Sequence, residues 1–317
     1  MSKAEKEVFP ITVIIPTRPG ESVVPAAEAA LRLDYPQELL EILVVRGTHP
    51  SCQRNLALRQ AKGELIYFLD DDSLPEPNVL QIGVKYFHNS KVKIVGGPNL
   101  CPPNAPRLEK LFALTMGSWI AFGPSRARYL RTGKPRTSSE KELILCNMLV
   151  SRQTLLDHGG FDEALYPNEE NALMDDILKE GGNLIYDPDF FVYRRPRRTL
   201  GAFCRMLITY GRGRAEQFRL HPGPGSLLNF IPPLFFLFTV ATPFLPWWIT
   251  APVWGFYFLT LLIQSWISGH GFKGISLLPL LFLTHLCYGL GFWLGLFTSP
   301  RSLSENEVKE IKIEKIL

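Results

Sequence analysis

Short apolar runs alternate with amphipathic stretches over the first two-thirds of the chain. Runs rich in Ile, Val and Leu that end at Pro, Gly or Asp are typical of buried strands, and apolar positions at helical spacing predict helices. The predicted strands are Ile11–Ile15, Glu41–Val45, Glu64–Leu69, Lys93–Val95 and Asn183–Asp187, and the predicted helices are Ala26–Leu33, Ser51–Lys62, Asn78–Phe87 and Glu169–Glu180. This alternation predicts an α/β fold with a mostly parallel sheet.

The middle of the chain follows neither period. Residues 98–140 are rich in Pro, Gly and Arg, and a long irregular segment of this kind is often a functional loop such as a lid. Beyond it, Asn168 is placed to cap the helix that starts at Glu169. Leu173 and Ile177 would share one face of that helix, and Gly181 would end it.

Residues 227–297 are almost free of charge, and this change in composition predicts a domain boundary. Three apolar runs lie there, at about 227–250, 251–268 and 276–297. The first and third are long enough for a bilayer crossing, which needs roughly 20 residues. We therefore predict a sheet-containing domain at 1–221, a transmembrane helical region at 222–300 and a charged tail at 301–317. The alternative is a buried helical bundle of a soluble protein, and prolines in the first two runs leave the number of crossings open.

Net charge and cysteine content limit the possible binding partners and the cellular compartment. The net charge of +4 does not suggest binding of nucleic acid, but basic residues cluster at 126–136 and 194–219. The five cysteines are widely spaced and give no metal or disulfide pattern, which fits a reducing compartment. Because residues 1–7 are charged and lack an apolar segment, we expect the first domain to be cytoplasmic and the protein to be a multi-pass protein of the cell membrane.

An acidic triplet, Asp70-Asp71-Asp72, directly follows the predicted strand at 64–69. Ligands of parallel α/β sheets bind at the carboxyl ends of the strands, and Mg²⁺ or Mn²⁺ prefers carboxylate oxygen ligands. The alternative is a solvated turn in which Asp72 or Ser73 caps the next helix. Two further acids, Glu169 and Glu170, begin the later helix and are candidates for a general base, although acids at that position also simply complement the helix dipole.

Taken together, several segments resemble the inverting glycosyltransferases of family 2, which have the Rossmann-like GT-A fold. The matching segments are Ile11–Thr17, Glu41–Val45, Phe68–Asp72, Gly159–Glu163 and Glu169–Glu170 with Leu173. Within the family, the segment Tyr210–Arg214 ahead of apolar helices is similar to glucosyltransferases of the succinoglycan type.

The resemblance implies a role for each matching residue. Asp72 and Asp70 would hold Mg²⁺ or Mn²⁺, Glu170 would be the catalytic base with Glu169 beside it, and Gly160 would precede the acceptor-side loop. The residues expected at the nucleotide-sugar donor are Pro16, Thr17, Arg18, Asp70 and Asp71. Arg212 and Arg214 are also expected there, because the glycines around them favour a close-fitting phosphate site. The arginines at 194–219 have the alternative role of a juxtamembrane anchor for anionic lipid.

The sequence departs from the family pattern at three points. Arg46-Gly47 stands where the family usually has an acid that reads the nucleotide base, so the base specificity is open. Glu170 replaces the usual catalytic Asp, and the Gln-x-x-Arg-Trp signature of processive synthases is absent, which favours addition of a single sugar.

These observations support three hypotheses. The first is a membrane-bound hexosyltransferase that moves a sugar from a nucleotide-sugar onto a lipid-linked saccharide in polysaccharide biosynthesis. The second is a polyprenyl-phosphate glycosyltransferase, which needs no sugar acceptor. The third is a non-catalytic scaffold of a polysaccharide assembly complex.

Overall fold

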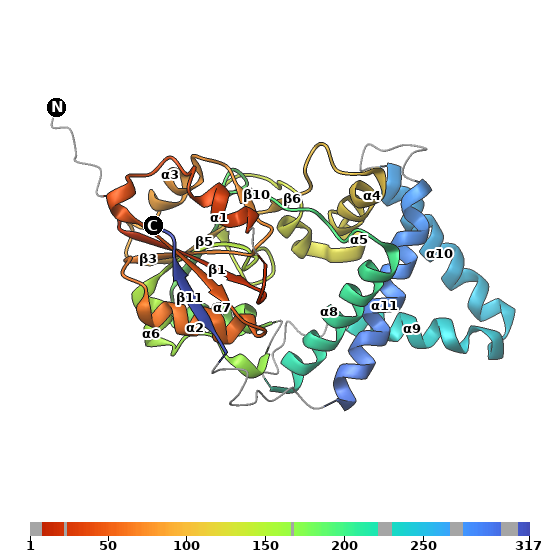
Figure 1. Cartoon of the computed structure of the whole chain (residues 1–317). Helices are drawn as coiled ribbons and strands as arrows, with labels where there is room; N and C mark the ends of the chain where they lie inside the picture. The colour runs from red at the N-terminus through yellow and green to blue at the C-terminus, as the bar shows by residue number, and fades with distance from the viewer. Residues whose placement is uncertain (1–7, 22–23, 166–167, 221–229, 267–274, 299–309) are drawn as a thin grey trace. The chain divides into compact units, whose positions relative to one another are not determined.

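The structure is a computed structural model that describes residues 8–21, 24–165, 168–220, 230–266, 275–298 and 310–317. It divides into two compact units (Figure 1). The sheet unit comprises Met1–Pro102, Ala127–Arg194 and Arg301–Leu317. The helical unit comprises Pro103–Arg126 and Arg195–Pro300. Each unit is therefore assembled from segments that are far apart in the sequence.

A central sheet forms the sheet unit. Its strands lie in the order β11-β2-β1-β3-β8-β5-β9-β7, and their bounds are β1 Ile11–Thr17, β2 Leu40–Arg46, β3 Leu65–Leu69, β5 Val92–Gly96, β7 Arg136–Ser138, β8 Asn147–Ser151, β9 Asn183–Tyr186 and β11 Lys312–Lys315. β1 is parallel to β2 and β3, and β5 is parallel to β9. β8, β7 and β11 are antiparallel to their neighbours. The sheet is thus mixed, and the prediction of a mostly parallel sheet was wrong because the apolar segment after residue 143 enters the sheet as β8 between β3 and β5.

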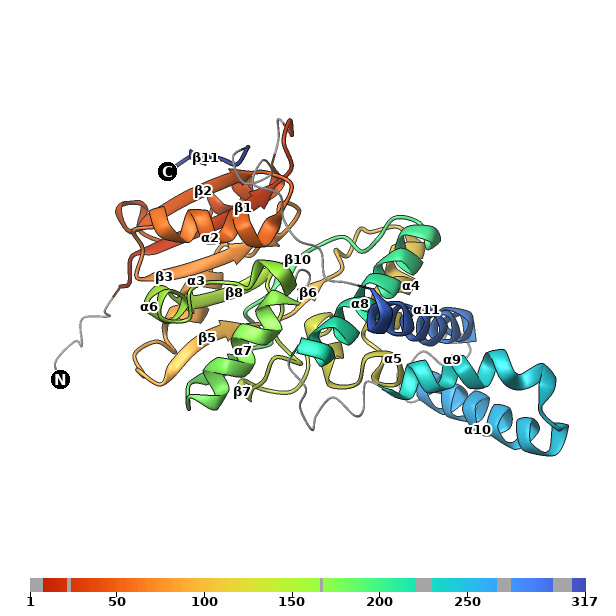
Figure 2. The same cartoon turned by 90° about the horizontal axis from the view of Figure 1, so that it is seen from below.

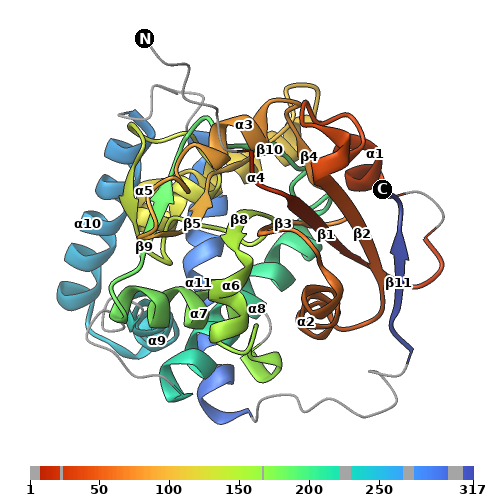
Figure 3. The ribbon, with the colours of Figure 1, turned by 90° about the vertical axis from the view of Figure 1, so that its left-hand side faces the viewer.

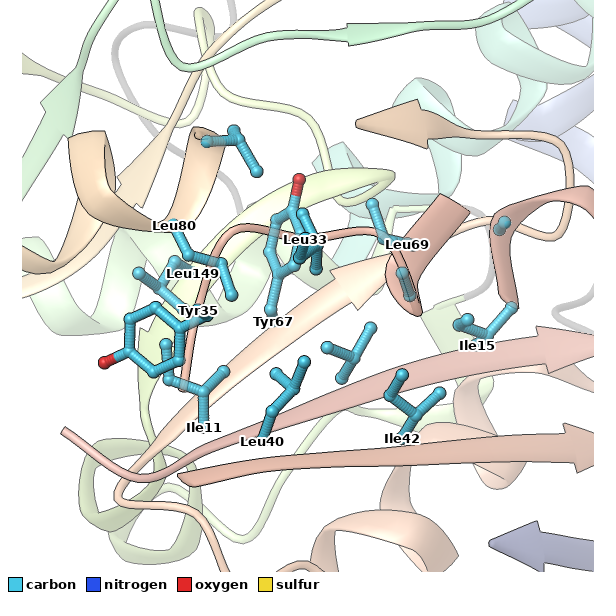
Figure 4. Packing of buried hydrophobic residues seen from close by; sticks show 14 of the residues in the cluster. Ile11, Ile15, Leu33, Tyr35, Leu40, Ile42, Tyr67, Leu69, Leu80 and Leu149 are labelled. Carbon is cyan, nitrogen blue, oxygen red and sulfur yellow. The ribbon is translucent and has the colours of Figure 1, made fainter. Parts of the chain in front are cut away.

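Alternating residues of the strands face two separate cores. Ile11, Val13 and Ile15 of β1 join one cluster, and Ile14 joins the other. Figure 4 shows the first cluster, in which Ile11, Leu40, Tyr67 and other side chains gather on one face of β1, β2 and β3. Burial on both faces explains why these strands read as continuous apolar runs rather than as an alternating pattern.

Helices cover both faces of the sheet (Figure 3). α1 (Pro25–Ala30) and α3 (Val79–Val84) supply apolar residues to the first cluster. α2 (Pro50–Gln60), α6 (Arg152–Asp157) and α7 (Glu169–Lys179) supply the second. Short 3₁₀ turns lie at η1 (Gln37–Leu39), η2 (Gly123–Arg128) and η3 (Glu163–Leu165). The predicted helices and strands of this unit are confirmed, with ends that differ by a few residues.

A small second sheet lies beside the acidic triplet. It contains β4 (Leu74–Pro75), β10 (Val192–Tyr193) and β6 (Asn99–Leu100), with β10 in the middle. β10 is antiparallel to β4, with Tyr193 opposite Leu74. This register brings the residue after β10, Arg194, next to the residues just before β4, which are the aspartates.

The helical unit is built from α4 (Arg107–Met116), α5 (Trp119–Phe122), α8 (Leu200–Leu220), α9 (Ile231–Ala241), η5 (Thr242–Phe244), α10 (Trp247–Ser265) and α11 (Leu278–Phe297) (Figure 2). α4 and α5 correct the expectation of an irregular loop at 98–140. Phe112 of α4 is fully buried and stacks on Phe203 of α8, with ring centroids 4.3 Å apart. Charged residues interleaved with the apolar ones concealed this helix in the sequence.

The apolar C-terminal runs form shorter helices than predicted. The first run is not continuous, because α9 ends at Ala241 and α10 begins only after Pro246. α10 carries Pro252 inside the helix. Within the described residues, one helix, Ile275–Phe297, is long and apolar enough to cross a membrane. A multi-pass arrangement is therefore not supported.

Candidate functional site

The acidic triplet lies where β3 ends, next to the end of its parallel neighbour β1. The backbone turns sharply there, with Ser73 N–H donating to the carbonyl of Asp70 over 3.0 Å. The carbonyl of Asp71 accepts a hydrogen bond from the Ala26 amide at the start of α1. The strand end and the first turn of α1 thereby fix the directions of the three carboxylates.

Two arginines form ion pairs with the acidic triplet. Arg54 of α2 binds one oxygen of Asp70 at 3.0 Å, and Arg194 binds the other at 3.1 Å. Arg194 also reaches Asp72, with 2.6 Å between Nε and Oδ1. Asp70 and Asp72 therefore converge on one guanidinium group, that of Arg194.

The middle aspartate has a different environment. Burial, reinforced by the charges of Asp72 and Asp70, raises the pKa of Asp71 to about 6. Burial works against the charged form of Arg194, but the charges around it, led by Asp70, prevail and raise its pKa. Arg194 is consequently a permanent positive charge at the triplet.

The start of α7 is linked to the triplet through Arg54. Glu169 is 2% exposed and binds Arg54 at 3.1 Å, on the opposite side of the guanidinium from Asp70. Burial and the charge of Glu170 raise the pKa of Glu169 to about 7, although Arg54 acts in the opposite direction. Arg54 thus connects the strand end, α2 and the acidic helix start in one network of charges.

The predicted position of the α7 cap is confirmed, but its chemistry differs. Asn168 occupies the N-cap position, yet its side chain makes no capping hydrogen bond. Its Oδ1 accepts a hydrogen bond from the side-chain amide of Asn171 at 3.0 Å, and Oδ1 of Asn171 in turn accepts one from Arg128 at 2.7 Å. At the other end, Gly181 has a φ of 84° just past the end of α7, as the sequence predicted.

The Gly159–Glu163 segment is anchored on the residue next to Arg54. Asn55 donates to the carbonyl of Phe161 at 2.8 Å and accepts from the Phe161 amide at 2.8 Å. Gly160 has a φ of 87°, and a Cβ there would lie 2.4 Å from Asn55 Oδ1. Glycine is therefore required at position 160 because the backbone there packs closely against α2. This contact fixes the segment Gly159–Glu163, which precedes α7.

The end of β1 lies beside the end of β2, which in turn pairs with the tail strand β11. Pro16 and Thr17 are buried at the strand end, and Arg18 is exposed. The carbonyl of Thr17 accepts from Gln53 at 2.9 Å. Arg46, at the end of β2, pairs with Glu314 of β11 at 2.9 Å. The position where the family usually has an acid is thus basic and already paired with an acid from the tail.

Arg212 and Arg214 lie on α8 in the helical unit. Arg212 pairs with Glu216 at 2.7 Å, and Arg214 donates to Gln217 at 3.0 Å. Gly211, which suggested a close-fitting phosphate site, has another role: a Cβ there would lie 2.1 Å from the Tyr288 carbonyl oxygen of α11. The role of the two arginines in donor binding stays a prediction.

The donor set of the triplet suits a hard divalent cation. No group of three or more His, Cys, Asp or Glu side chains that could hold a metal ion occurs among the described residues. Mg²⁺ and Mn²⁺ are, however, commonly bound through one or two carboxylates together with substrate phosphates. Asp70 and Asp72 provide such a pair, and the hydroxyl of the adjacent Ser73 is buried without a hydrogen-bond partner among the described residues.

Sequence reasoning missed three residues of this network: Arg54, Asn55 and Arg194. Arg194 was grouped with a basic segment, and only the pairing of β10 with β4 reveals its proximity to the triplet. Arg54 and Asn55 lie within a predicted helix, where one sequence offers no sign that polar residues are buried. An arginine 4% exposed inside the domain is identifiable only from the structure.

A mixed sheet with helices on both faces, an acidic triplet at a strand end and buried glutamates at a helix start define a GT-A-like α/β unit. The family model for "Glycosyltransferase like family 2" matches residues 10–207. The chain therefore belongs to glycosyltransferase family 2, and it is a glycosyltransferase by family.

One solved structure has a similar fold. Mannosyltransferase PcManGT from Pyrobaculum calidifontis, in complex with GDP-Man and Mn²⁺, is 18% identical and has a TM-score of 0.58, and the alignment covers 92% of this chain and 88% of that one. TarS 1–349 of S. aureus, in complex with UDP, is 13% identical with a TM-score of 0.46 over 90% of each chain. The search of curated proteins returned no match. The similarity to succinoglycan-type enzymes stays a prediction.

Proposed function

We propose that the protein is an inverting hexosyltransferase that moves a sugar from a nucleotide-sugar onto a lipid-linked saccharide, in polysaccharide biosynthesis at the cytoplasmic face of a membrane. The observation that carries this proposal is the convergence of Asp70 and Asp72 on one cationic centre at the end of β3. The mannosyltransferase with a similar fold was solved with GDP-Man and Mn²⁺, which supports a nucleotide-sugar and a divalent metal here.

The proposed donor site lies at the ends of β1 and β3. Asp70 and Asp72 would hold Mg²⁺ or Mn²⁺, which offsets the negative charge of the departing nucleoside diphosphate. Pro16, Thr17, Arg18 and Asp71 would surround the nucleotide, with Arg212 and Arg214 at its phosphates. Arg194 would release the carboxylates as the metal binds and could then bind a phosphate oxygen.

The proposed base is Glu170. The acceptor hydroxyl attacks the anomeric carbon, the bond from that carbon to the diphosphate oxygen breaks, and the hydroxyl proton passes to the Glu170 carboxylate. Glu169 is held by Arg54 at 3.1 Å, which supports a positioning role for Glu169.

The site is tested with purified protein in detergent, a panel of labelled nucleotide-sugars, lipid extracts as acceptor and added Mn²⁺. We expect Asp72→Asn and Glu170→Gln to lower transfer about 10²–10⁴-fold, the range of a lost general base for the second. Glu180→Gln is the matched control, because its side chain is 69% exposed at the far end of the same helix. Near-full transfer by both site variants would contradict the assigned roles.

The same assay separates the alternatives. A product with one sugar on an acid-labile lipid phosphate would identify a polyprenyl-phosphate glycosyltransferase. Failure of every nucleotide-sugar to bind with Mn²⁺ would favour a scaffold.

A further inference from the structure

The sheet unit contains residues up to Arg194, before the long helical segment, and also residues 301–317, which follow that segment in the sequence. β11 pairs antiparallel with β2, with Ile313 opposite Val45. Ile311 and Ile313 pack against one core cluster, and Leu317 packs against the other. The chain therefore leaves the sheet unit after Arg194, forms the helical unit and returns to the same sheet. Because one sheet cannot lie on both sides of a membrane, an odd number of crossings is excluded.

α11 is the obvious candidate for a crossing, but it is not free to face lipid. It lies along α8 in close backbone contact: a Cβ at Gly291 would lie 2.1 Å from the Ile208 carbonyl oxygen, and one at Gly295 would lie 2.3 Å from that of Arg212. Arg219 of α8 donates to the carbonyl of Thr298, just past α11, at 2.6 Å. A crossing by α11 would draw the arginines of α8 into hydrocarbon, which is strongly unfavourable.

The surface of the α9–η5–α10 segment has the opposite character. Its large apolar side chains point outward, with Phe244 87%, Trp247 75% and Phe256 73% exposed. Between Arg219 and Arg301 the sequence has a single charged residue, Lys273. Apolar exposure of this extent is typical of a surface covered by lipid or by a partner.

The turn between α9 and α10 favours a position within the lipid over one in water on the far side of the membrane. α9 has 11 residues. At 1.5 Å per residue such a helix is about 16 Å long, roughly half of the hydrocarbon thickness. α10, with 19 residues and about 28 Å, has to lie oblique to the membrane to stay in the same leaflet. The turn at the end of α9, residues 242–246, has no charged side chain, whereas a turn emerging on the far side would lie in water. After the turn, α10 packs back against α9, and Phe235 of α9 stacks on Tyr257 of α10 with ring centroids 4.4 Å apart.

We propose that the helical unit is a monotopic anchor: α9, η5 and α10 enter one leaflet of a bilayer and return to the same face. The basic helix α8 stays at the phosphates of that leaflet, where the exposed side chains of Arg205 and Arg219 meet anionic headgroups. This inference rests on the membrane association in the proposed function, and it replaces the multi-pass arrangement expected from the sequence. It puts the site and the lipid-linked acceptor on one side of the membrane without any crossing.

Topology is tested first. The full chain carries an epitope at either end, and protease is added to intact spheroplasts or to inverted vesicles. We expect both epitopes to be cleaved only in inverted vesicles. A C-terminal epitope cleaved on the opposite side from the N-terminal one would overturn the proposal.

The depth of the turn is tested with a membrane-impermeant maleimide and the variant Phe244→Cys. We expect no labelling above that of the wild type from either side. Leu31→Cys, at a position 45% exposed in the sheet unit, is the control and should be labelled in inverted vesicles. Labelling of Phe244→Cys from the far side would show that the segment crosses.

The third measurement uses intrinsic fluorescence. All six tryptophans belong to the helical unit, so their emission reports on that unit alone. In vesicles of phosphatidylcholine and phosphatidylglycerol with brominated acyl chains we expect strong quenching, and clearly less in Trp247→Phe/Trp248→Phe. Unquenched emission, with the apolar surface buried between copies of the chain, would overturn the proposal. None of these measurements depends on glycosyl transfer, so the proposed function and the proposed topology can fail separately.

Discussion

The bridge made by Arg54 leads to a sharp prediction about stability. Arg54 and Glu169 are 4% and 2% exposed, and they pair at 3.1 Å. In Arg54→Met the Glu169 carboxylate loses its cation while it stays buried. At pH 8, where Glu169 is mostly ionised in the wild type, removal of its buried partner should cost about 3–5 kcal/mol. At roughly 2–4 °C per kcal/mol for a domain of this size, the melting temperature should fall by about 6–20 °C.

The pH dependence of this loss has a defined sign. The folded-state pKa of Glu169 is about 7, above its ordinary value of 4.5, so the protonated form is favoured in the folded protein and stability falls as pH rises through that interval. Arg54 opposes this shift, and its removal raises the pKa further. The difference between wild type and Arg54→Met should therefore be larger at pH 8 than at pH 6, where Glu169 is mostly protonated in both.

The assay is thermal unfolding in detergent, followed by circular dichroism, for a double-mutant cycle. Glu169→Gln alone should cost only about 1 kcal/mol, a typical value for one hydrogen bond, because Arg54 keeps its pair with Asp70 at 3.0 Å. In the Arg54→Met background the same change should restore most of the lost stability. If Arg54→Met and Arg54→Met/Glu169→Gln unfold at the same temperature, the explanation by an uncompensated charge is refuted.

Three further predictions concern other contacts of the structure. Gly291→Ala should destabilise the helical unit by at least about 1–3 kcal/mol in thermal unfolding, because its methyl group would lie 2.1 Å from a backbone atom. The control Gly255→Ala, with nothing within 4 Å, should be neutral or slightly stabilising. Equal effects of the two variants would contradict the close packing of α8 and α11. Ile313→Ala should lower the free energy of unfolding by about 1–2 kcal/mol, and Glu314→Gln by at most about 1 kcal/mol, because apolar packing outweighs an exposed ion pair. The reverse order in chemical denaturation would argue against β11 as a packed strand. Arg194→Met should tighten Mn²⁺ binding several-fold in calorimetric titration, since Arg194 competes for Asp70 and Asp72, and unchanged or weaker binding would count against competition.

The strands around the triplet could be predicted because burial on both faces makes them continuous apolar runs. β1, β2 and β3 are examples, and their ends differ from the prediction by one or two residues. β11 could not be predicted, because Lys312–Lys315 is a charged segment whose pairing depends on a strand far away in the sequence. α4 was missed for a similar reason: its buried Glu109 is compensated by Arg195, a partner that local pattern does not show.

The candidate site was partly predictable. A short acidic motif after an apolar run is visible in the sequence, so Asp70, Asp71 and Asp72 could be singled out as candidates. Their binding partners could not, because Arg54 and Arg194 reach the triplet through tertiary packing and the register of a two-residue strand. Gly211 of α8 packs closely against the Tyr288 carbonyl of α11, so a glycine beside arginines does not by itself distinguish helix packing from a phosphate site.

The position of β11 at the edge of the sheet has a consequence for biogenesis. During synthesis, α9, α10 and α11 emerge from the ribosome before β11, while β2 has long been made. Until β11 arrives, β2 presents an open edge, which is the kind of surface on which strands of other chains assemble into aggregates. β2 is covered only when the chain comes back from the helical unit, and the short, charged β11 then forms the edge. Translation that stalls between α11 and β11 should therefore leave a protein prone to aggregation.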